Sequence, residues 1–184
     1  MIKLIISDFD GTLVDTFDAN YQAYQRAFSE VNLVLTKEDY KRCFGFRFER
    51  FMSTMNITDE QTIQKIRDLK KQHYPNFFKY LAINTPLAEL ISTFHSNEGK
   101  TAIASTARRE NLEKALQYTN LHSMFDLILA GEEVEHGKPS PEIYKKVMQK
   151  MNVLPEETLI FEDSEVGILS AKASKAHFMK VEIL

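Results

Sequence analysis

The segment Asp8-Phe9-Asp10-Gly11-Thr12 comes at the end of the apolar run Ile2–Ile6, which has the composition of a buried strand. In an extended chain alternate side chains point the same way, so Asp8 and Asp10 can reach one small volume, and Gly11 allows a sharp turn directly after them. Carboxylates this close repel each other, and a divalent cation is the usual way to relieve that repulsion. The segment predicts a carboxylate pair at the carboxyl end of a strand, where open α/β sheets place their chemistry. Calcium loops and plain turns contain such pairs too, so the rest of the chain has to supply partners.

The composition is that of an ordinary soluble globular protein, whose 184 residues suit one domain or a domain with an insert. Because the formal net charge is -3 and there is no long basic run, we expect neither nucleic acid nor membrane as a partner. Cys43 is the single cysteine, which excludes an intramolecular disulfide, and we interpret it as a packing residue of the helical region. Met1 leads directly into the first predicted strand. We therefore expect no signal peptide and no membrane span, and predict a cytoplasmic location.

Short apolar runs alternate with helical patterns in the second half of the chain. The runs are too uniformly apolar to show alternation, as is typical of parallel strands covered on both faces. This rhythm predicts an α/β fold, a Rossmann-like, mostly parallel sheet flanked by helices. The predicted strands are Thr101–Ala104, Leu127–Ala130, Thr158–Phe161 and Phe178–Val181, and the predicted helices are Leu87–Ser96, Arg109–Thr119, Pro141–Met151 and Val166–Lys175.

Three small residues are typical of helix ends. Ser140, followed by Pro141, and Ser164 are predicted to cap the starts of two helices. Gly99 is predicted to end the helix before the second strand.

Between Thr16 and about Pro86 the pattern becomes helical throughout. Apolar residues recur at helical spacing and predict an insert of about four helices without a strand. We predict an α/β core formed by residues 1–15 and 86–184 and an all-helical cap formed by residues 16–85. Short hinges would join them, since no flexible linker is visible, and Asp15 would cap the first cap helix. Because the insert directly follows the aspartate pair, it would cover the site as a lid.

Four predicted strand ends bring polar groups to one edge of the sheet. Hydroxyls, an ammonium group and four carboxylates fit together around a phosphoryl group and a hard cation. The cation neutralises acids and phosphate alike, and without it an anionic substrate would meet four acids. The residues are Asp8 and Asp10 from the first strand, Ser105 and Thr106 from the second, Lys138 from the loop after the third, and Glu162 and Asp163 from the fourth.

Each of these residues also has a plain structural interpretation. The two aspartates could be turn residues, and Lys138 a solvated loop lysine, although its Gly-Lys-Pro-x-Pro setting favours a functional role. Ser105 could simply terminate its strand, and the neighbouring Thr106 could donate in its place. Glu162 could be a capping acid or a residue behind the metal.

Together, these segments resemble the motifs of the haloacid dehalogenase superfamily. The resemblance is to the branch with a helical cap inserted after the first strand (the C1 type), which includes enzymes similar to phosphoglycolate phosphatase and β-phosphoglucomutase. Four motifs in the family's order are highly specific, although one alone is not. They span nearly the whole chain and stand at residues 8–15, 103–106, 137–144 and 161–164.

The resemblance implies phosphoryl-transfer chemistry. Asp8 would be the nucleophile and form an aspartyl-phosphate, and Asp10 would be general acid toward the leaving alcohol and then base toward water. Dehalogenases of the superfamily lack an acid at the second position and phosphonatases carry a small residue there, because neither has to protonate an alkoxide. The acid at Asp10 therefore favours hydrolysis of a small phosphorylated metabolite, a phosphomonoester.

The resemblance also distributes the metal and the phosphoryl group among the motif residues. Mg²⁺ would be held by Asp8, by the backbone carbonyl of Asp10 and by Asp163, with Glu162 supporting it from beside or behind. The phosphoryl oxygens would be bound by Ser105, Thr106 and Lys138, and Lys138 would also keep Asp8 ionised.

The predicted cap departs from the pattern of β-phosphoglucomutases. These enzymes carry a histidine in the helix after the first motif and an arginine in a Gly-x-x-Arg loop, whereas this chain has Asn20 and Phe48, with Arg47 shifted in phase. A mutase must hold a second phosphate, so phosphatase is favoured, with a phosphomutase as the alternative and a non-catalytic binding module as a further one. Asn20, Arg47 and Arg108 are the candidate substrate contacts. The chain stops just after its fifth predicted strand, where relatives commonly add a helix and a strand, and we expect a monomer or a weak dimer.

Overall fold

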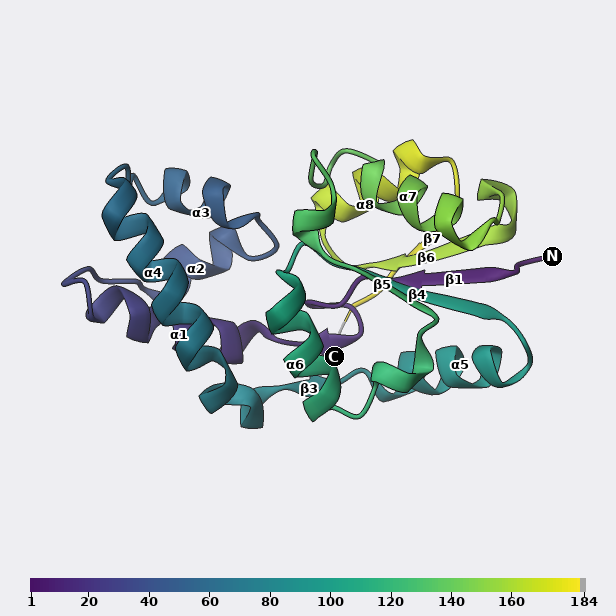
Figure 1. Cartoon of the computed structure of the whole chain (residues 1–184), viewed down its shortest axis with the longest axis horizontal. Helices are drawn as coiled ribbons and strands as arrows, with labels where there is room; N and C mark the ends of the chain where they lie inside the picture. Colours follow the sequence, from purple (N-terminus) through teal and green to yellow (C-terminus); the bar gives the residue numbers. More distant parts are fainter. Residues whose placement is uncertain (183–184) are drawn as a thin grey trace. The chain divides into compact units, whose positions relative to one another are not determined.

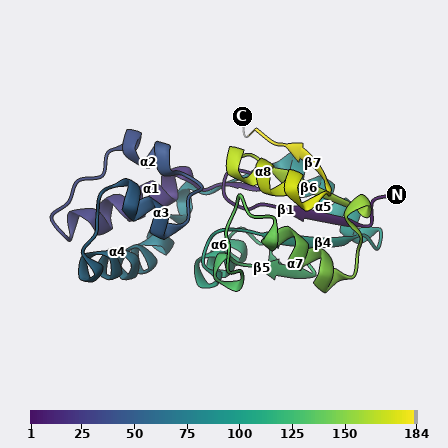
Figure 2. The same cartoon turned by 90° about the horizontal axis from the view of Figure 1, so that it is seen from above.

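The computed structural model describes residues 1–182 and divides the chain into two compact units (Figure 1 and Figure 2). The first unit contains Met1–Asp15 and Ala82–Leu184, and the second contains Thr16–Leu81. The last two residues of the predicted core range, Ile183 and Leu184, lie outside the described residues. Among residues 1–182, no helix has both the length and the apolar character that crossing a membrane requires.

A five-stranded parallel sheet forms the centre of the first unit, with strand order β5-β4-β1-β6-β7. The first strand lies in the middle, so the chain builds the sheet outward from it in both directions. In such sheets the carboxyl ends of the strands on either side of the reversal form a crevice. The predicted α/β fold is confirmed, and the strands are β1 (Leu4–Ser7), β4 (Lys100–Ala104), β5 (Leu127–Leu129), β6 (Thr158–Glu162) and β7 (His177–Lys180).

Helices cover both faces of this sheet (Figure 1). On one face lie α7 (Glu142–Met151) and α8 (Glu165–Ser174), and on the other lie α5 (Thr85–Ser96) and α6 (Arg109–Tyr118). The first face holds a buried apolar cluster in which α7 and α8 pack against alternate residues of the strands. Its members include Leu4, Ile6, Ala102, Ala104, Leu129, Ile143, Tyr144, Val147, Ile160 and Ala171.

Two of the predicted helix ends differ from the structure. Asn97 and Glu98 end α5, and Glu98, not Gly99, takes the left-handed conformation with a φ of 65°. Gly99 is needed for a different reason, because a Cβ there would lie 2.3 Å from the ring of Phe94. At α7 the capping position is Pro141, and Ser140 accepts a hydrogen bond from the Glu142 N–H through its Oγ at 3.3 Å.

The two crossings between the units run side by side as an antiparallel ribbon that the sequence pattern did not indicate. Val14–Asp15 (β2) pairs with Ala82–Ile83 (β3). The prediction that Asp15 caps the first helix of the insert is therefore wrong, since its backbone pairs with Ala82 and Thr16 takes the position before the helix.

The second unit is a helical bundle with an aromatic core. A buried cluster that includes Phe28, Tyr40, Phe51 and Ile66 joins its helices, and Cys43 packs into it, with burial raising the pKa of its thiol. Cys43 is therefore a core residue. The unit contains α1 (Phe17–Ser29), α2 (Lys37–Cys43), α3 (Phe48–Thr54), α4 (Glu60–His73) and the 3₁₀-helix η1 (Tyr74–Tyr80).

Candidate active site

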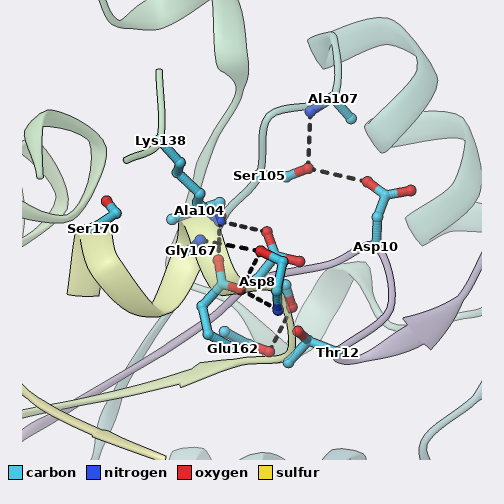
Figure 3. A network of polar contacts seen from close by, with 12 residues as sticks. Asp8, Asp10, Thr12, Ala104, Ser105, Ala107, Lys138, Glu162, Gly167 and Ser170 are labelled. Atoms are coloured by element: carbon cyan, nitrogen blue, oxygen red, sulfur yellow. Dashed lines mark hydrogen bonds and ion pairs between the residues drawn. The ribbon is translucent and has the colours of Figure 1, made fainter. Parts of the chain in front are cut away.

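The carboxyl ends of three neighbouring strands carry the candidate residues of the first unit. Asp8 directly follows β1, Ser105 directly follows β4, and Asp163 directly follows β6, which itself ends on Glu162. Because these strands are parallel neighbours, the side chains after them meet at one edge of the sheet. Lys138 reaches the same place from the loop before α7, as Figure 3 shows.

Lys138 is the hub of this cluster. Its ammonium group donates to Asp8 Oδ1 at 2.6 Å, to Glu162 Oε1 at 2.5 Å and to the Ala104 carbonyl at 3.1 Å, while its side chain is only 3% exposed (Figure 3). Burial opposes a charge here, but the attraction of the two carboxylates outweighs burial and raises the pKa of Lys138 well above its ordinary value. A fixed cation therefore stands beside Asp8.

Both oxygens of Glu162 are already occupied by hydrogen-bond donors. Besides Lys138, Oε1 accepts from the Tyr144 hydroxyl at 2.7 Å, and Oε2 accepts from the Asp163 N–H and from the N–H and hydroxyl of Ser164. Burial favours a neutral Glu162, but Lys138 and these donors hold the pKa of its carboxyl below the ordinary value. Glu162 is thus an ionised group inside the protein that faces Lys138.

Asp8, Glu162 and Asp163 form an acidic cluster that could hold a metal ion. Each offers an oxygen, and these oxygens lie within 4.8 Å of one another. Burial raises the pKa of Asp8 well above its ordinary value, with neighbouring carboxylates adding to the rise and Lys138 opposing it. Burial also raises the pKa of Asp163 to about 6. Carboxylate oxygens with surplus negative charge are what a hard divalent cation prefers, and of the three acids Asp8 and Asp163 are less occupied than Glu162.

Thr12 links the first motif to the fourth. Its hydroxyl donates to Asp163 Oδ1 at 2.8 Å, although the two residues lie 151 positions apart in the sequence. Gly11 precedes it with a φ of 87°, a left-handed conformation that favours glycine and turns the chain back after Asp10. Thr12 thereby orients one of the candidate metal ligands.

Ser105 and Asp10 form the second half of the cluster. The buried Ser105 hydroxyl donates to Asp10 Oδ2 at 3.3 Å and accepts from the Ala107 N–H at 3.0 Å (Figure 3). Thr106 lies partly exposed beside them, and its carbonyl is packed so closely against Gly131 that a Cβ on the glycine would approach it to 2.3 Å. This packing holds the loop after β4 in place.

Of the remaining candidate residues, one follows the second motif and two belong to the other unit. Arg108 is exposed at the start of α6, whereas the neighbouring Arg109 is paired with Glu113 and Glu133. Asn20 is buried in α1 and Arg47 stands before α3, so both belong to the second unit. The three residues stay predictions as substrate contacts.

Three residues that sequence reasoning did not assign to the site contact it: Thr12, Tyr144 and Gly167. A Cβ on Gly167 would lie 1.9 Å from the carboxyl carbon of Glu162. A glycine inside a helix destabilises it by about 1 kcal/mol relative to alanine, so its presence in α8 was a usable signal of close approach. Thr12 and Tyr144 stand inside the first and third motifs, but only the fold shows that their hydroxyls contact the residues of the fourth motif.

Comparisons with known proteins assign the family. The model of the family described as haloacid dehalogenase-like hydrolase matches residues 5–181. The chain belongs to this family. Among similar proteins, a phosphorylated carbohydrates phosphatase of Thermotoga maritima is 32% identical over 180 residues, covering 94% of this chain and 82% of the relative. The CbbY protein of Rhodobacter capsulatus is 31% identical over 186 residues, with the same two shares.

Solved structures share this fold. The crystal structure of CbbY from Rhodobacter sphaeroides in complex with phosphate superposes with a TM-score of 0.90 at 24% identity, covering 100% of this chain and 88% of that one. The family, together with the phosphatase among the similar proteins, supports a hydrolase of phosphoric monoesters.

Proposed function

We propose that the protein is a Mg²⁺-dependent phosphatase that hydrolyses a small phosphomonoester through an aspartyl-phosphate on Asp8. The observation that carries this proposal is the group formed by the buried Asp8, the buried ammonium group of Lys138 and the partly buried Asp163 at the carboxyl edge of the sheet. It combines a carboxylate nucleophile, a fixed cation for phosphate oxygens and a second acid for a metal.

The reaction needs two displacements at phosphorus. In the first, an oxygen of Asp8 bonds to phosphorus as the ester P–O bond breaks, and protonated Asp10 gives its proton to the departing alkoxide. In the second, water attacks phosphorus, Asp10 takes up its proton, and the bond to Asp8 breaks to release phosphate. The Ser105 hydroxyl, which contacts Asp10 Oδ2, orients the acid for both proton transfers, and Lys138 orients Asp8.

Asp8, Asp163 and the backbone carbonyl of Asp10 would hold the metal, with Glu162 behind them. When bound, Mg²⁺ would neutralise the surplus negative charge of these carboxylates and of the phosphoryl group. The Thr12 hydroxyl keeps Asp163 in position for this role. Lys138 and Ser105 would bind the phosphoryl oxygens, as the family resemblance implies.

Release of inorganic phosphate from a panel of substrates tests the function directly. We expect p-nitrophenyl phosphate and one or more phosphorylated sugars to be hydrolysed, the latter because a similar protein is a phosphorylated carbohydrates phosphatase. Activity should require Mg²⁺ and disappear with EDTA. A sugar phosphate isomerised without phosphate release would instead indicate a mutase, and inactivity on the whole panel with Mg²⁺ present would contradict the phosphatase.

A rise in pH should lower the stability of the metal-free protein, whereas binding of Mg²⁺ should raise it. In the metal-free protein the folded pKa of Asp163, about 6, lies above its ordinary value of 3.8, so the folded chain retains a proton that the unfolded chain releases. The free energy of unfolding should therefore fall as pH rises from about 4 to about 6, and Asp8 acts in the same direction. Scanning calorimetry in EDTA should show this fall, reduced in Asp163→Asn.

Addition of Mg²⁺ at pH 7 should restore the stability that the metal-free protein loses as pH rises. A ligand at a hundred times its Kd adds about 2.7 kcal/mol, which is roughly 5–11 °C in Tm for a chain of this size. The gain should be smaller at pH 5, because the ligands must first release protons. A Tm that does not respond to Mg²⁺ at pH 7 would speak against a metal site at these carboxylates.

A further inference from the structure

We propose that Tyr144 is a positioning residue for phosphoryl transfer: its hydroxyl holds Glu162 so that Glu162 fixes the ammonium group of Lys138 against Asp8. The inference rests on the proposed function, since it assigns Asp8 and Lys138 their roles. The inference assigns a functional role to a residue of α7, a helix on the face of the sheet, in addition to the residues at the strand ends.

Tyr144 packs in the apolar cluster under α7, and its hydroxyl and ring face also contact Glu162 and Lys138. Its side chain is fully buried, its hydroxyl donates to Glu162 Oε1 at 2.7 Å, and the Lys138 Nζ lies 5.1 Å from the centre of its ring. One oxygen of Glu162 thus receives both the tyrosine hydroxyl and the lysine ammonium group. A buried ring that contacts the lysine and its counter-ion can orient them, but its lack of exposure keeps it from touching substrate.

The opposite side of Glu162 is closed by α8, so the carboxylate has no second place to lie. A Cβ on Gly167 would come within 1.9 to 2.1 Å of the three carboxyl atoms, and Oε2 is held by donors from Asp163 and Ser164. Figure 3 shows Gly167 beside Glu162. Glu162 is therefore held between the Tyr144 hydroxyl on α7 and the closely packed backbone of α8 at Gly167.

Tyr144→Phe is the first test, because it keeps the ring and removes only the hydroxyl. We expect kcat to fall about 10- to 100-fold, as is usual when a group that orients an active-site residue is lost. The matched control is Ser174→Ala, which removes another buried hydroxyl, bonded to the Ala171 carbonyl at 2.6 Å, from the same unit and outside the site. The control should keep the wild-type kcat even if its Tm falls as far as that of Tyr144→Phe.

Two readouts separate positioning from a general structural role. In a Lys138→Met background, Tyr144→Phe should lower kcat no further, because the group it positions is gone, whereas a structural defect would lower kcat equally in both backgrounds. A crystal structure of Tyr144→Phe should show the distance from Lys138 Nζ to Asp8 Oδ1 lengthened beyond about 3.5 Å, outside hydrogen-bond range.

Gly167→Ala should also lower kcat, because the added methyl group would displace Glu162 from the side of α8. Folding should not suffer, since alanine favours the helix. An exposed substitution on α8, Lys172→Ala, is the control and should be silent. Wild-type kcat in Tyr144→Phe, with the Lys138–Asp8 contact unchanged, would overturn the inference and leave the phosphatase standing. Inactivity of the wild type on every phosphate ester would instead contradict the proposed function, and the crystal structures would still decide whether Tyr144 positions Lys138.

Discussion

The Asp8→Asn variant should lose about 10⁴-fold or more in kcat, the size of loss seen when a covalent nucleophile is removed. An amide cannot form the acyl-phosphate bond, whereas the other residues of the site stay in place. Asparagine has the shape of aspartate, and its carbonyl oxygen can still accept the hydrogen bond that Lys138 donates to Asp8 Oδ1. The loss therefore belongs to the chemical step rather than to folding.

In contrast to kcat, the thermal stability of Asp8→Asn should not fall. Burial raises the pKa of Asp8, Lys138 opposes the rise, and the neighbouring carboxylates of Glu162, Asp163 and Asp10 add to it. Removing one negative charge lessens the repulsion, while Glu162 still pairs with Lys138. In EDTA at pH 7 the Tm of Asp8→Asn should be equal to that of the wild type or higher.

Asp126→Asn is the informative control for this experiment. Asp126 lies in the same unit and accepts a hydrogen bond from the Thr101 N–H at 2.8 Å, outside the candidate site. Its replacement should lower stability by about 1 kcal/mol and leave kcat unchanged. If Asp8→Asn kept even a hundredth of the wild-type kcat, in a preparation free of other phosphatases, Asp8 would not be the nucleophile.

The sheet and the edge that carries the site could be predicted because both depend on short-range patterns. Each buried strand is a run of apolar residues, and each predicted strand lies within about two residues of the observed one, as with Thr158–Phe161 against Thr158–Glu162. Polar residues directly after such runs must gather at one edge of a parallel sheet, so Asp8, Ser105 and Asp163 could be expected to meet.

The ribbon of β2 and β3 could not be predicted in the same way. Two-residue strands have no periodicity, and the pairing of Asp15 with Ala82 joins segments on either side of an insert. Gly99 is predicted from the sequence to end α5, whereas Glu98 adopts the left-handed conformation at the end of this helix. A glycine beside a helix end signals either a turn or a close approach, and only the position of Phe94 decides between them.

Two contacts of the site that join separate motifs were missed for a related reason. Thr12 and Tyr144 lie within the first and third motifs, but their hydrogen bonds to Asp163 and Glu162 could not be predicted from the motifs, because only folding brings these segments together. The saturation of Glu162 by donors likewise depends on where α7 and α8 pack. Sequence motifs thus indicate which groups do the chemistry, and the packing of the helices shows what holds those groups.

Lys138→Met should be strongly destabilising at pH 7 and should lower kcat by about 10²-fold or more. Methionine fills a similar volume but leaves Asp8 and Glu162 as buried carboxylates without their cation. Removing one partner of a buried ion pair lowers the free energy of unfolding by about 3–5 kcal/mol, since the remaining charge has lost both water and counter-ion. Urea unfolding at pH 7 measures this directly.

The pH dependence of this loss tests its electrostatic origin. Without the lysine, the folded pKa values of Asp8 and Glu162 should both lie above their ordinary values, so the variant should regain stability relative to the wild type as pH falls toward 5. The double variant Asp8→Asn with Lys138→Met should also recover part of the loss, because the amide needs no cation beside it. Equal deficits at pH 5 and pH 7, with no recovery in the double variant, would show that Lys138 stabilises the fold by packing and is not the counter-charge of these acids.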